Sequence, residues 1–463
     1  MTLIKSISGI RGTIGGEPGN GLTPVDIVKY TAAYGSWLKS ISDNKKVVLG
    51  RDARLSGKMV SGLVVSTLQG LGLDVVDLGL STTPTVEMAV VFESAAGGII
   101  LTASHNPAQW NALKLLNAQG EFISDEDGKK ILELADKDEF VFADVKKLGS
   151  YVQDDTYLDK HIEAILKLPL VKPELIASKN FKIAIDAVNS TGGIAVPKLL
   201  KALGVNQITG YYCEPNGNFP HNPEPLPENL GFISSEMANG QFDLGIVVDP
   251  DVDRLCFVNE DGGFFGEEYT LVAIADYVVK NTPGNTVSNL SSTRALKDVT
   301  EKHGQIYYAA AVGEVNVVTK MKENNAIIGG EGNGGVIYPE LHYGRDALVG
   351  IALFLTHLAE FGKSVSMLRS KYPNYYISKN KIELTPEIDV DLVLKAIEKK
   401  YQKQPINTID GVKIEFGKEW VHLRKSNTEP IIRIYAESDT QATSEHLGNK
   451  IIMDIKEVIS TKN

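Results

Sequence analysis

Hydrophobic and polar positions follow two periods along most of the chain. Short runs of β-branched and other apolar residues, typical of buried strands, alternate with segments whose apolar residues recur at helical spacing. Three stretches, 46–79, 182–212 and 285–313, share one order of strand, polar or glycine-rich loop, amphipathic helix and second strand. This order predicts βαβ units and mixed or parallel sheets. Because the stretches lie further apart than solenoid repeats, we expect three related α/β domains with mixed sheets.

The last part of the chain follows a different pattern. A strand and a helix are predicted over 380–402, alternating strands around a turn over 410–426, and a closing amphipathic helix over 444–459. This α+β pattern predicts a separate, smaller C-terminal domain. The four expected domains cover residues 1–149, 150–256, 257–372 and 373–463.

Composition narrows the class of protein. At roughly 100–200 residues per domain, 463 residues fit three or four domains. The chain is 43% hydrophobic and 23% charged, as expected for a globular protein with sizeable cores. A net charge of -11 argues against broad electrostatic binding of nucleic acid. Small anions are not excluded, because a local group of arginines and lysines can hold a phosphate.

Cysteine content and apolar runs predict a cytoplasmic protein. Cys213 and Cys256 form no Cys-x-x-Cys pair, so neither a disulfide framework nor a thiolate zinc site is expected. The N-terminus lacks the apolar stretch of a signal peptide. No run approaches the ~20 apolar residues of a membrane helix. The longest apolar helical segment, 348–361, contains His357 and Glu360 and is predicted to be a core helix.

Ser104 lies on a predicted turn after an apolar strand over 98–101. Pro107 restricts His105 and Asn106 and favours a tight, exposed turn. A serine held in this way can receive a phosphoryl group. The alternative is a plain Ser/Asn/Pro turn.

Three carboxylates, Asp249, Asp251 and Asp253, follow a predicted buried strand. Carboxylates at i, i+2 and i+4 of a loop can converge on one hard cation. Magnesium takes few protein carboxylates and completes its octahedron with phosphate or water oxygens. We therefore predict a Mg²⁺ site in which a phosphorylated Ser104 supplies a further oxygen.

Three other interpretations of this loop remain open. An EF-hand uses the same positions and finds a glutamate at Glu260, but it requires glycine where Arg254 stands and a helix where a strand is predicted. A phosphatase with Asp249 as nucleophile also has Asp-x-Asp after an apolar strand. The third interpretation is a solvated acidic turn.

The segment 327–339 contains a literal Gly-x-Gly-x-x-Gly. A dinucleotide-binding fingerprint should open a helix, whereas β-formers and Pro339 follow here. A glycine-rich loop carrying Glu331 and Asn333 instead suits a polyhydroxyl ligand, because these side chains can accept and donate hydrogen bonds.

A basic loop lies near the C-terminus. Two arginines can grip a phosphate through fork-shaped contacts, and hydroxyl and amide groups complete an anion site. The alternative is a basic β-turn between edge strands. The loop residues are Arg424, Lys425, Ser426, Asn427, Thr428 and Arg433.

Two further segments carry charge without a decided role. Arg51, Asp52 and Arg54 occur in one loop and Arg11 in another, and either group is also compatible with a salt-bridged loop. The histidines show no spacing typical of a metal site, and His221 and His342 receive no role.

In their order along the chain, these segments resemble the motifs of the α-D-phosphohexomutase superfamily, which includes phosphoglucomutases, phosphomannomutases and phosphoglucosamine mutases. The resemblance covers nearly the whole chain and implies four domains around a central cleft, which carry in turn the phosphoserine, metal, sugar and phosphate loops. Its segments are GIRG, GRDARLSG, TASHNP, FPHNPEPLPENL, DPDVDR, GGEGNGG and RKSNTEPIIR.

The resemblance also implies residue roles. Ser104 matches the phosphoserine and a metal ligand, and Lys114 matches an acid/base lysine whose pKa we expect neighbouring positive charge to lower. The three aspartates match the magnesium loop, and Glu331 and Asn333 the sugar-hydroxyl positions. The transfer site would also include Arg11, His105 and Arg254, and the phosphate loop Arg424, Ser426, Asn427, Thr428 and Arg433.

The sequence departs from the family pattern at several positions. Ala112 replaces a common glycine, Pro250 stands where glycine is frequent, and Asn333 and Gly335 replace a serine and a histidine. The replacement of the family histidine by Gly335 removes a candidate proton-shuttle residue. The GEGNGG version is most similar to archaeal-type phosphoglucosamine mutases, which makes glucosamine phosphate the expected substrate, with glucose or mannose phosphate as the alternative.

The expected reaction interconverts hexose 6-phosphate and hexose 1-phosphate through a phosphoserine and a sugar 1,6-bisphosphate, with Mg²⁺ balancing charge on the transferring group. The expected partner is a small sugar phosphate, not nucleic acid or a membrane, and the chain is a monomer or a homodimer. A phosphatase that uses Asp249, or a silent sugar-phosphate-binding protein, is the alternative class.

Overall fold

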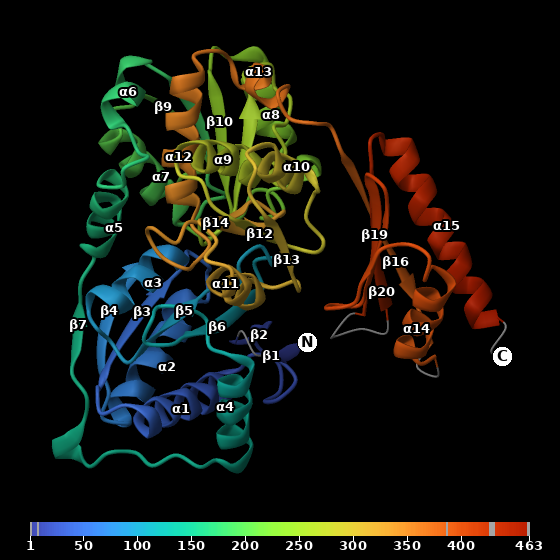
Figure 1. Cartoon of the computed structure of the whole chain (residues 1–463). Helices are drawn as coiled ribbons and strands as arrows, with labels where there is room; N and C mark the ends of the chain where they lie inside the picture. The colour runs from blue at the N-terminus through green and yellow to red at the C-terminus, as the bar shows by residue number, and fades with distance from the viewer. Residues whose placement is uncertain (1, 7–8, 386–387, 426–430, 461–463) are drawn as a thin grey trace. The chain divides into compact units, whose positions relative to one another are not determined.

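The computed structural model describes the chain except residues 1, 7–8, 386–387, 426–430 and 461–463 (Figure 1). It forms two compact units, which are described separately below. Unit 1 contains Met1–Thr270 and Asn333–Arg369, and unit 2 contains Leu271–Gly332 and Ser370–Asn463.

A seven-stranded mixed sheet begins unit 1, with the order β1-β2-β6-β5-β3-β4-β7. Strands β3, β4, β5 and β7 pair in parallel, while β1, β2 and β6 pair antiparallel. The strands are β1 (Leu3–Ser6), β2 (Gly9–Thr13), β3 (Lys46–Arg51), β4 (Asp74–Leu80), β5 (Gly97–Leu101), β6 (Trp110–Leu116) and β7 (Tyr151–Gln153).

Helices cover both faces of this sheet (Figure 1). One face packs against α1, α2 and α4 around a core that includes Trp37, Leu68 and Ile131. The other packs against α3, whose Val86 and Val90 meet Val48 of the sheet. The helices are α1 (Pro24–Ile41), α2 (Gly57–Gly70), α3 (Thr83–Phe92) and α4 (Asp125–Lys137).

The next part of unit 1 contains a second, four-stranded sheet with the order β11-β10-β8-β9. Strand β10 pairs in parallel with β8 and antiparallel with β11, so the chain reverses at the loop between β10 and β11. All five residues of β10 are buried. The elements are α5 (Tyr157–Leu166), α6 (Pro173–Ser178), β8 (Lys182–Asp186), α7 (Gly192–Ala202), β9 (Gln207–Tyr211), α8 (Gly231–Asn239), β10 (Leu244–Val248) and β11 (Leu255–Asn259).

Residues Asn333–Arg369 also belong to unit 1. They contain β15 (Gly335–Ile337), α12 (Ala347–Phe361) and α13 (Val365–Arg369). Helix α12 is buried over nearly its whole length, which confirms the core helix predicted at 348–361. Asp346 begins it, because its Oδ1 accepts from the backbone N–H groups of Leu348 and Val349.

Within unit 2, three strands of the third sheet pair in parallel, because β12 pairs with both β13 and β14. Helices α10 and α11 connect these strands in βαβ order. Helix α9 (Glu267–Asn281) starts in the last residues of the unit 1 segment and continues into unit 2. The other elements are β12 (Thr286–Asn289), α10 (Ala295–Lys302), β13 (Tyr307–Ala310), α11 (Glu314–Glu323) and β14 (Ile328–Glu331).

The C-terminal part of unit 2 is an antiparallel sheet, β16-β20-β19-β18-β17. Helices α14 and α15 pack on one face of it through Leu394, Ile451 and Ile455 (Figure 1). The elements are β16 (Tyr376–Glu383), α14 (Val390–Lys400), β17 (Ile406–Asn407), β18 (Val412–Phe416), β19 (Glu419–Lys425), β20 (Ile431–Ser438) and α15 (Gln441–Ser460).

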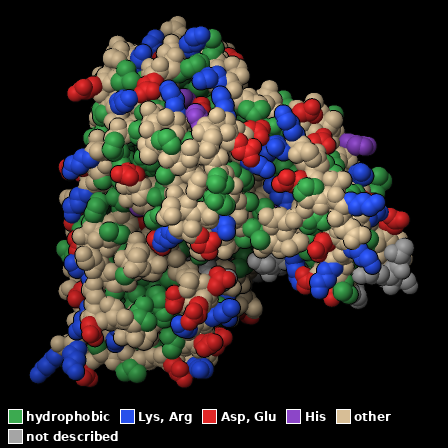
Figure 2. Space-filling view, in the orientation of Figure 1, with side chains coloured by type: hydrophobic (Ala, Val, Ile, Leu, Met, Phe, Trp, Pro, Cys, Tyr) green, Lys and Arg blue, Asp and Glu red, His purple; other side chains and the backbone are tan. Residues whose placement is uncertain are grey.

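The predicted fold class, three related α/β sheets followed by an α+β C-terminal domain, is confirmed. Charged side chains of both signs are interspersed over the face drawn in Figure 2, with apolar side chains scattered among them. Within the described residues, no helix combines the length and the apolar character needed to cross a membrane.

Candidate active site

Ser104 is buried and lies just beyond the end of β5, in a turn where its own backbone is left-handed (φ 49°). Its backbone N–H donates to Thr102 Oγ1 at 2.9 Å, which fixes the turn from within. Its hydroxyl donates to Asp249 Oδ2 at 2.8 Å, although 145 residues separate the two. The structure therefore brings the Ser104 turn and the aspartate loop together. The predicted exposure of the turn holds at Pro107, whereas Ser104 itself is buried.

Arg54 stabilises the Ser104 turn through hydrogen bonds to its backbone. Its guanidinium donates to the backbone oxygens of Ser104 and Asn106, each at 2.6 Å, and to those of Pro107 and Trp110 at 2.7 and 2.9 Å. Its Nε also donates to Asp52 at 3.0 Å, and both side chains are fully buried. The GRDARLSG loop is thus the support of the Ser104 turn and more than a surface salt bridge.

The aspartate loop connects β10 to β11, and its three carboxylates are all fully buried. Asp249 Oδ1 accepts from the backbone N–H groups of Asp253 and Arg254, each at 3.1 Å, so the loop folds back on its first residue. The carboxylate oxygens of the three aspartates lie within 4.8 Å of one another. A strand, not a helix, precedes the loop, which excludes the EF-hand interpretation.

Cations and a hydroxyl surround the outer two carboxylates. Lys114 Nζ donates to Asp251 Oδ2 at 2.8 Å and lies 3.4 Å from Asp253 Oδ2. Thr83, at the start of α3, donates from its hydroxyl to Asp251 Oδ2 at 2.5 Å. Arg345 Nη2 donates to Asp253 Oδ2 at 2.7 Å. Asp251 and Asp253 are therefore held in place by hydrogen bonds from side chains outside the loop.

Burial and neighbouring charges shift the pKa values in opposite directions. Burial, with Asp253 and Asp251 close by, raises the pKa of Asp249 well above its usual value. Burial also opposes ionisation of Asp253, but Arg345 and Lys114 hold its pKa below the usual range. Burial alone would lower the pKa of Lys114, yet Asp251 and Asp253 raise it. The expected lowering of this lysine's pKa is therefore wrong, because carboxylates outweigh cations around it.

The three carboxylates fit a divalent cation. The Oδ1 atoms of Asp251 and Asp253 are buried and have no hydrogen-bond partner within the described chain. A buried, unpaired carboxylate oxygen is costly unless a cation or donor satisfies it. Oxygen ligands in a compact loop are the donors that Mg²⁺ prefers. Asp249, Asp251 and Asp253 are the residues that would hold it.

His105 and Arg254 share a carboxylate from a segment that sequence reasoning did not use. Arg254 Nη1 donates to Glu224 Oε1 at 3.1 Å, and His105 Nε2 lies 3.9 Å from the same oxygen. His105 Nδ1 lies 3.4 Å from Ser104 Oγ. Burial and the charge of Arg254 lower the pKa of His105 to about 2, so its imidazole is neutral near pH 7. Arg11 reaches the same turn, where its Nη1 donates to Asn106 Oδ1 at 3.4 Å.

The glycine-rich loop divides between the two units. In unit 2, Glu331 at the end of β14 accepts from Asn289 Nδ2 at 2.8 Å and from the Gly313 N–H at 3.1 Å. In unit 1, Asn333 Oδ1 accepts from the Gly335 N–H at 3.2 Å. Strand β15, not a helix, follows the glycines, so the dinucleotide interpretation stays rejected.

Arg424 and Arg433 are cross-strand partners on β19 and β20. Arg424 is half-buried and its Nε lies 2.7 Å from Asp410 Oδ2, while Arg433 is exposed. Both strands are interior strands of the sheet, not edge strands. The other candidates of this loop, Ser426, Asn427 and Thr428, lie outside the described residues.

Sequence reasoning missed three side chains that contact the candidate site. They are Thr83, Glu224 and Arg345. Glu224 lies in FPHNPEPLPENL, a segment matched to the family but given no role, and this was the available signal. Thr83 and Arg345 carry no local signal. The histidines also depart from expectation, because His161 and His342 meet at Asp346 despite their separation in sequence.

Comparison with known proteins decides the family. Models described as phosphoglucomutase/phosphomannomutase domains I, II and III and the C-terminal domain match residues 3–142, 157–263, 266–375 and 381–452. The chain belongs to the α-D-phosphohexomutase superfamily. A phosphohexomutase is an intramolecular phosphotransferase, so the phosphatase and silent-binder interpretations are not retained.

Individual relatives agree with this assignment. A "Phosphoglucomutase/phosphomannomutase" of Thermococcus kodakarensis is 35% identical, with 96% of this chain and 97% of the relative covered. A "Phosphoglucosamine/phosphogalactosamine mutase" of Sulfurisphaera tokodaii is 32% identical over 100% of both chains. The crystal structure of a phosphoglucomutase/phosphomannomutase family protein from Burkholderia thailandensis matches with a TM-score of 0.84, 26% identity and 98% of each chain covered. The relatives' names thus differ in substrate.

Proposed function

We propose that this phosphohexomutase interconverts hexose 6-phosphate and hexose 1-phosphate through a phosphorylated Ser104. The observation that carries the proposal is the 2.8 Å contact between Ser104 Oγ and Asp249 Oδ2, within a buried group of three carboxylates. A hydroxyl in this position can carry a phosphoryl group whose oxygens face a cation held by the loop. The left-handed backbone of Ser104 and the grip of Arg54 fix that position.

The exchange occurs in two transfers. In the first, the phosphoryl group leaves Ser104 Oγ for a free sugar hydroxyl, the proton of that hydroxyl ends on Ser104 Oγ, and a 1,6-bisphosphate forms. In the second, the bisphosphate, turned around, returns its other phosphoryl group to Ser104, and the Ser104 proton ends on the sugar oxygen that is freed. Mg²⁺ bound by the aspartates would neutralise charge on the transferring oxygens. Lys114 carries a proton in these surroundings, so it can donate to an oxygen that gains charge.

Residues elsewhere would bind the rest of the substrate. Glu331 and Asn333 offer acceptors and donors suited to sugar hydroxyls. Arg424 and Arg433, on adjacent strands, present two guanidinium groups to one phosphate, with Ser426, Asn427 and Thr428 between them in sequence. Contacts to a dianion by charge and fork geometry tolerate both orientations of the bisphosphate, because they do not read the sugar ring.

Glucosamine phosphate is the substrate that we propose within the hexoses. Relatives with "phosphoglucosamine" in their names from Methanopyrus kandleri and Sulfurisphaera tokodaii support it. The competing assignment, glucose or mannose phosphate, has the support of the Thermococcus relative. Comparing kcat/KM for the 6-phosphates of glucosamine, glucose and mannose decides between them. A higher value for glucose or mannose phosphate would overturn the glucosamine assignment while leaving the mutase mechanism intact.

The phosphoserine is tested with Ser104→Ala. Intact-mass measurement should show one phosphoryl group on the native protein incubated with a sugar 1,6-bisphosphate and none on the variant, and the variant should not interconvert the two phosphates. Ser178→Ala is the matched control, because Ser178 is exposed and its hydroxyl donates to the Leu175 backbone oxygen of its own helix. Full turnover by Ser104→Ala would refute the mechanism.

A further inference from the structure

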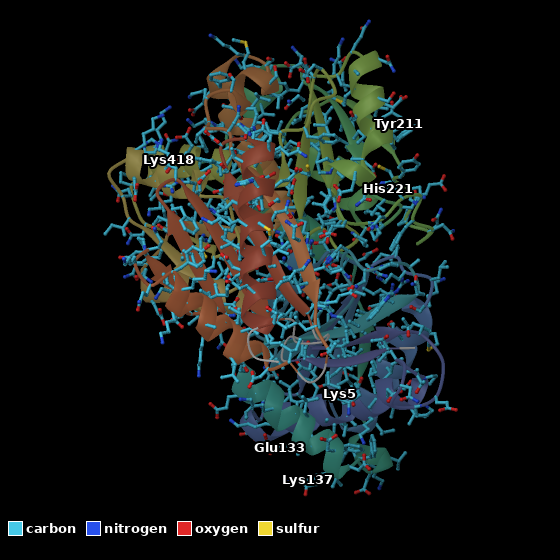
Figure 3. All side chains as sticks on the ribbon, turned by 90° about the vertical axis from the view of Figure 1, so that its right-hand side faces the viewer. Lys5, Glu133, Lys137, Tyr211, His221 and Lys418 are labelled. Atoms are coloured by element: carbon cyan, nitrogen blue, oxygen red, sulfur yellow. The ribbon has the colours of Figure 1, made fainter. Side chains whose placement is uncertain are left out.

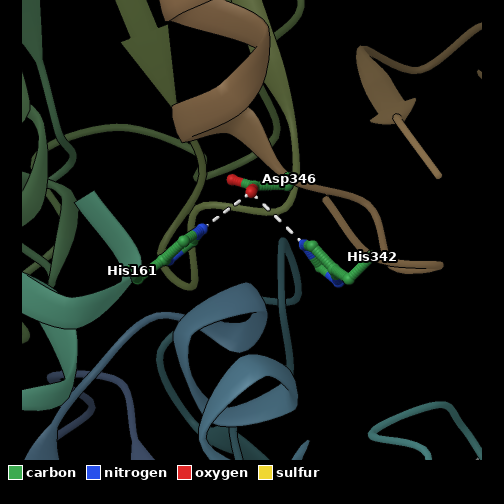
Figure 4. A group of neighbouring side chains, drawn as sticks. All are labelled: His161, His342 and Asp346. Atoms are coloured by element: carbon green, nitrogen blue, oxygen red, sulfur yellow. Dashed lines mark hydrogen bonds and ion pairs between the residues drawn. The ribbon is translucent and has the colours of Figure 1, made fainter. Parts of the chain in front are cut away.

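A second group of metal-ligand side chains, drawn in Figure 4, lies in unit 1 and shares no residue with the three aspartates. His161 comes from α5, while His342 and Asp346 come from the segment that leads into α12. His161 Nε2 lies 2.9 Å and His342 Nε2 lies 3.3 Å from the same oxygen, Asp346 Oδ2. The three ligand atoms all lie within 4.8 Å of one another.

The group is built into the fold. The side chains of His161 and Asp346 are fully buried, and that of His342 is 10% exposed. Asp346 uses its other oxygen, Oδ1, to begin α12, which leaves Oδ2 directed at the two imidazoles. The ring planes of the histidines are nearly perpendicular, at 87°, so both Nε2 atoms converge on one point without stacking (Figure 4).

The outer nitrogens of both histidines face oxygen acceptors on helix α3. His161 Nδ1 lies 3.0 Å from Thr85 Oγ1, and His342 Nδ1 lies 3.5 Å from Glu87 Oε2. Metal-bound histidines commonly donate their second N–H to such an oxygen, which fixes the tautomer and leaves the other nitrogen free to bind the metal. That tautomer, in this protein, would direct the lone pair of each Nε2 toward Asp346.

Two imidazole nitrogens and one carboxylate oxygen converge in this buried space, and either protons or a cation must lie between them. Two neutral imidazoles can satisfy both contacts with one Nε2–H each, because Asp346 Oδ2 can accept from both, whereas a bound cation would take the lone pairs of all three atoms. Two imidazole nitrogens and one carboxylate oxygen suit zinc and similar transition metals. Magnesium, which prefers oxygen ligands, belongs to the aspartate loop instead.

We propose that His161, His342 and Asp346 bind a divalent transition-metal ion of the zinc class, separate from the Mg²⁺ site. The ion would tie α3, α5 and the start of α12 together. Residues next to these ligands contact the aspartate loop, since Arg345 donates to Asp253 and Thr83, two positions before Thr85, donates to Asp251. The ion therefore has a structural role, which is to fix both supports of the catalytic loop.

The test is metal binding by the full chain with the aspartate loop saturated by excess Mg²⁺. Metal-free protein is titrated with Co²⁺, whose visible absorption reports nitrogen ligands and low coordination number, and with Zn²⁺ by calorimetry. We expect one ion per chain. His342→Ala should abolish the Co²⁺ absorption, and Glu87→Gln, which alters the outer contact of His342, should weaken Zn²⁺ binding about 10- to 100-fold.

Two controls separate this site from others. His446→Ala, at an exposed histidine of α15, should bind Zn²⁺ as the native chain does. Asp251→Asn should retain the Co²⁺ absorption, because the aspartate loop is not involved. Circular dichroism of the metal-free variants verifies that each is folded. The proposal is overturned if the folded native chain gives no Co²⁺ absorption, or if His342→Ala and Glu87→Gln both leave Zn²⁺ affinity unchanged.

Discussion

Arg345 passes through the space beside Gly335 in which a β-carbon would stand. A β-carbon built at residue 335 would lie 2.4 Å from Arg345 Cδ, well inside van der Waals contact. The same arginine donates to Asp253 Oδ2 at 2.7 Å. The absence of a side chain at 335 therefore gives Arg345 its route to the aspartate loop. Where the family pattern has a histidine, this chain has an arginine from another segment.

Gly335→Ala should displace Arg345 and lower kcat while leaving the protein folded. A small misplacement of a group at a catalytic loop can cost up to about 100-fold in rate, and we expect a loss of about 10- to 100-fold. Steady-state kinetics of Gly335→Ala, Arg345→Met and the double variant measure it. Because both changes act through one contact, their effects should not multiply. Gly231→Ala, at a glycine with open space around it, is the control, and multiplying effects would contradict the linkage.

Arg54→Met should destabilise the protein as well as inactivate it. The guanidinium joins Asp52 to four backbone oxygens of the Ser104 turn, and the pair is fully buried. Removing one partner of a buried ion pair typically costs about 3–5 kcal/mol in the free energy of unfolding. Urea unfolding measures the loss, and intact mass measures phosphorylation of Ser104.

Two further variants are compared with Arg54→Met for stability and for phosphorylation of Ser104. Arg54→Lys keeps the charge but cannot bridge several carbonyls, so it should also lose phosphorylation. Arg51→Lys, at a half-buried arginine whose Nη1 donates to the Asp52 backbone oxygen at 3.2 Å, should change stability little. An Arg54→Lys variant with native stability and native phosphorylation would show that charge alone suffices.

Asp249→Asn should be inactive yet at least as stable as the native chain without Mg²⁺. The asparagine oxygen can still accept from the backbone N–H groups of Asp253 and Arg254, while one of three crowded negative charges disappears. Mg²⁺ at about 100 times its Kd should add about 2.7 kcal/mol to the native chain by mass action. Thermal unfolding with Mg²⁺ and with EDTA compares the two proteins. Equal stabilisation of both by Mg²⁺ would place the ion elsewhere.

Much of this fold follows from local pattern. The apolar run before Ser104, the buried strand before Asp249 and the amphipathic closing helix all have their counterparts in β5, β10 and α15. Each of these elements is determined by residues adjacent in sequence, because periodicity and turn residues act over a few positions. The ordered motifs placed Ser104 and the aspartates in one family site, which no single motif does.

The supports of the site were not predictable in the same way. Arg345 reaches Asp253 across 92 residues, and His161 meets Asp346 across 185. An arginine or a buried histidine has the same local signature whether it forms a surface ion pair or contacts a buried loop from a distant segment. The sign of the Lys114 pKa shift failed for a related reason, because it depends on whether the nearest charges in space are carboxylates or cations.

His221 gives the structure a pH-dependent contribution to stability. Its Nε2 lies 3.1 and 3.2 Å from the two carboxylate oxygens of Asp186, and its side chain is labelled in Figure 3. Burial lowers the pKa of His221, but the hydrogen bond and charge of Asp186 raise it by more than burial lowers it, so the net shift is upward. A raised pKa means that the folded state binds the proton more tightly than the unfolded state. The contribution is therefore complete below the unfolded pKa, about 6.5, and is lost as pH rises through the folded value.

His221→Gln should consequently cost more stability at pH 6 than at pH 9. Glutamine can still donate one hydrogen bond to Asp186, but it carries no charge at either pH. The variant therefore loses the part of the stability that depends on protonation of His221 and keeps a hydrogen bond. Urea unfolding of both proteins across this range gives the difference in the free energy of unfolding, which should shrink steadily as pH rises. His446→Gln, on the exposed face of α15, should show no such trend. A difference between native chain and His221→Gln that is constant with pH would mean that the histidine is neutral in the folded protein and contributes only by its hydrogen bonds.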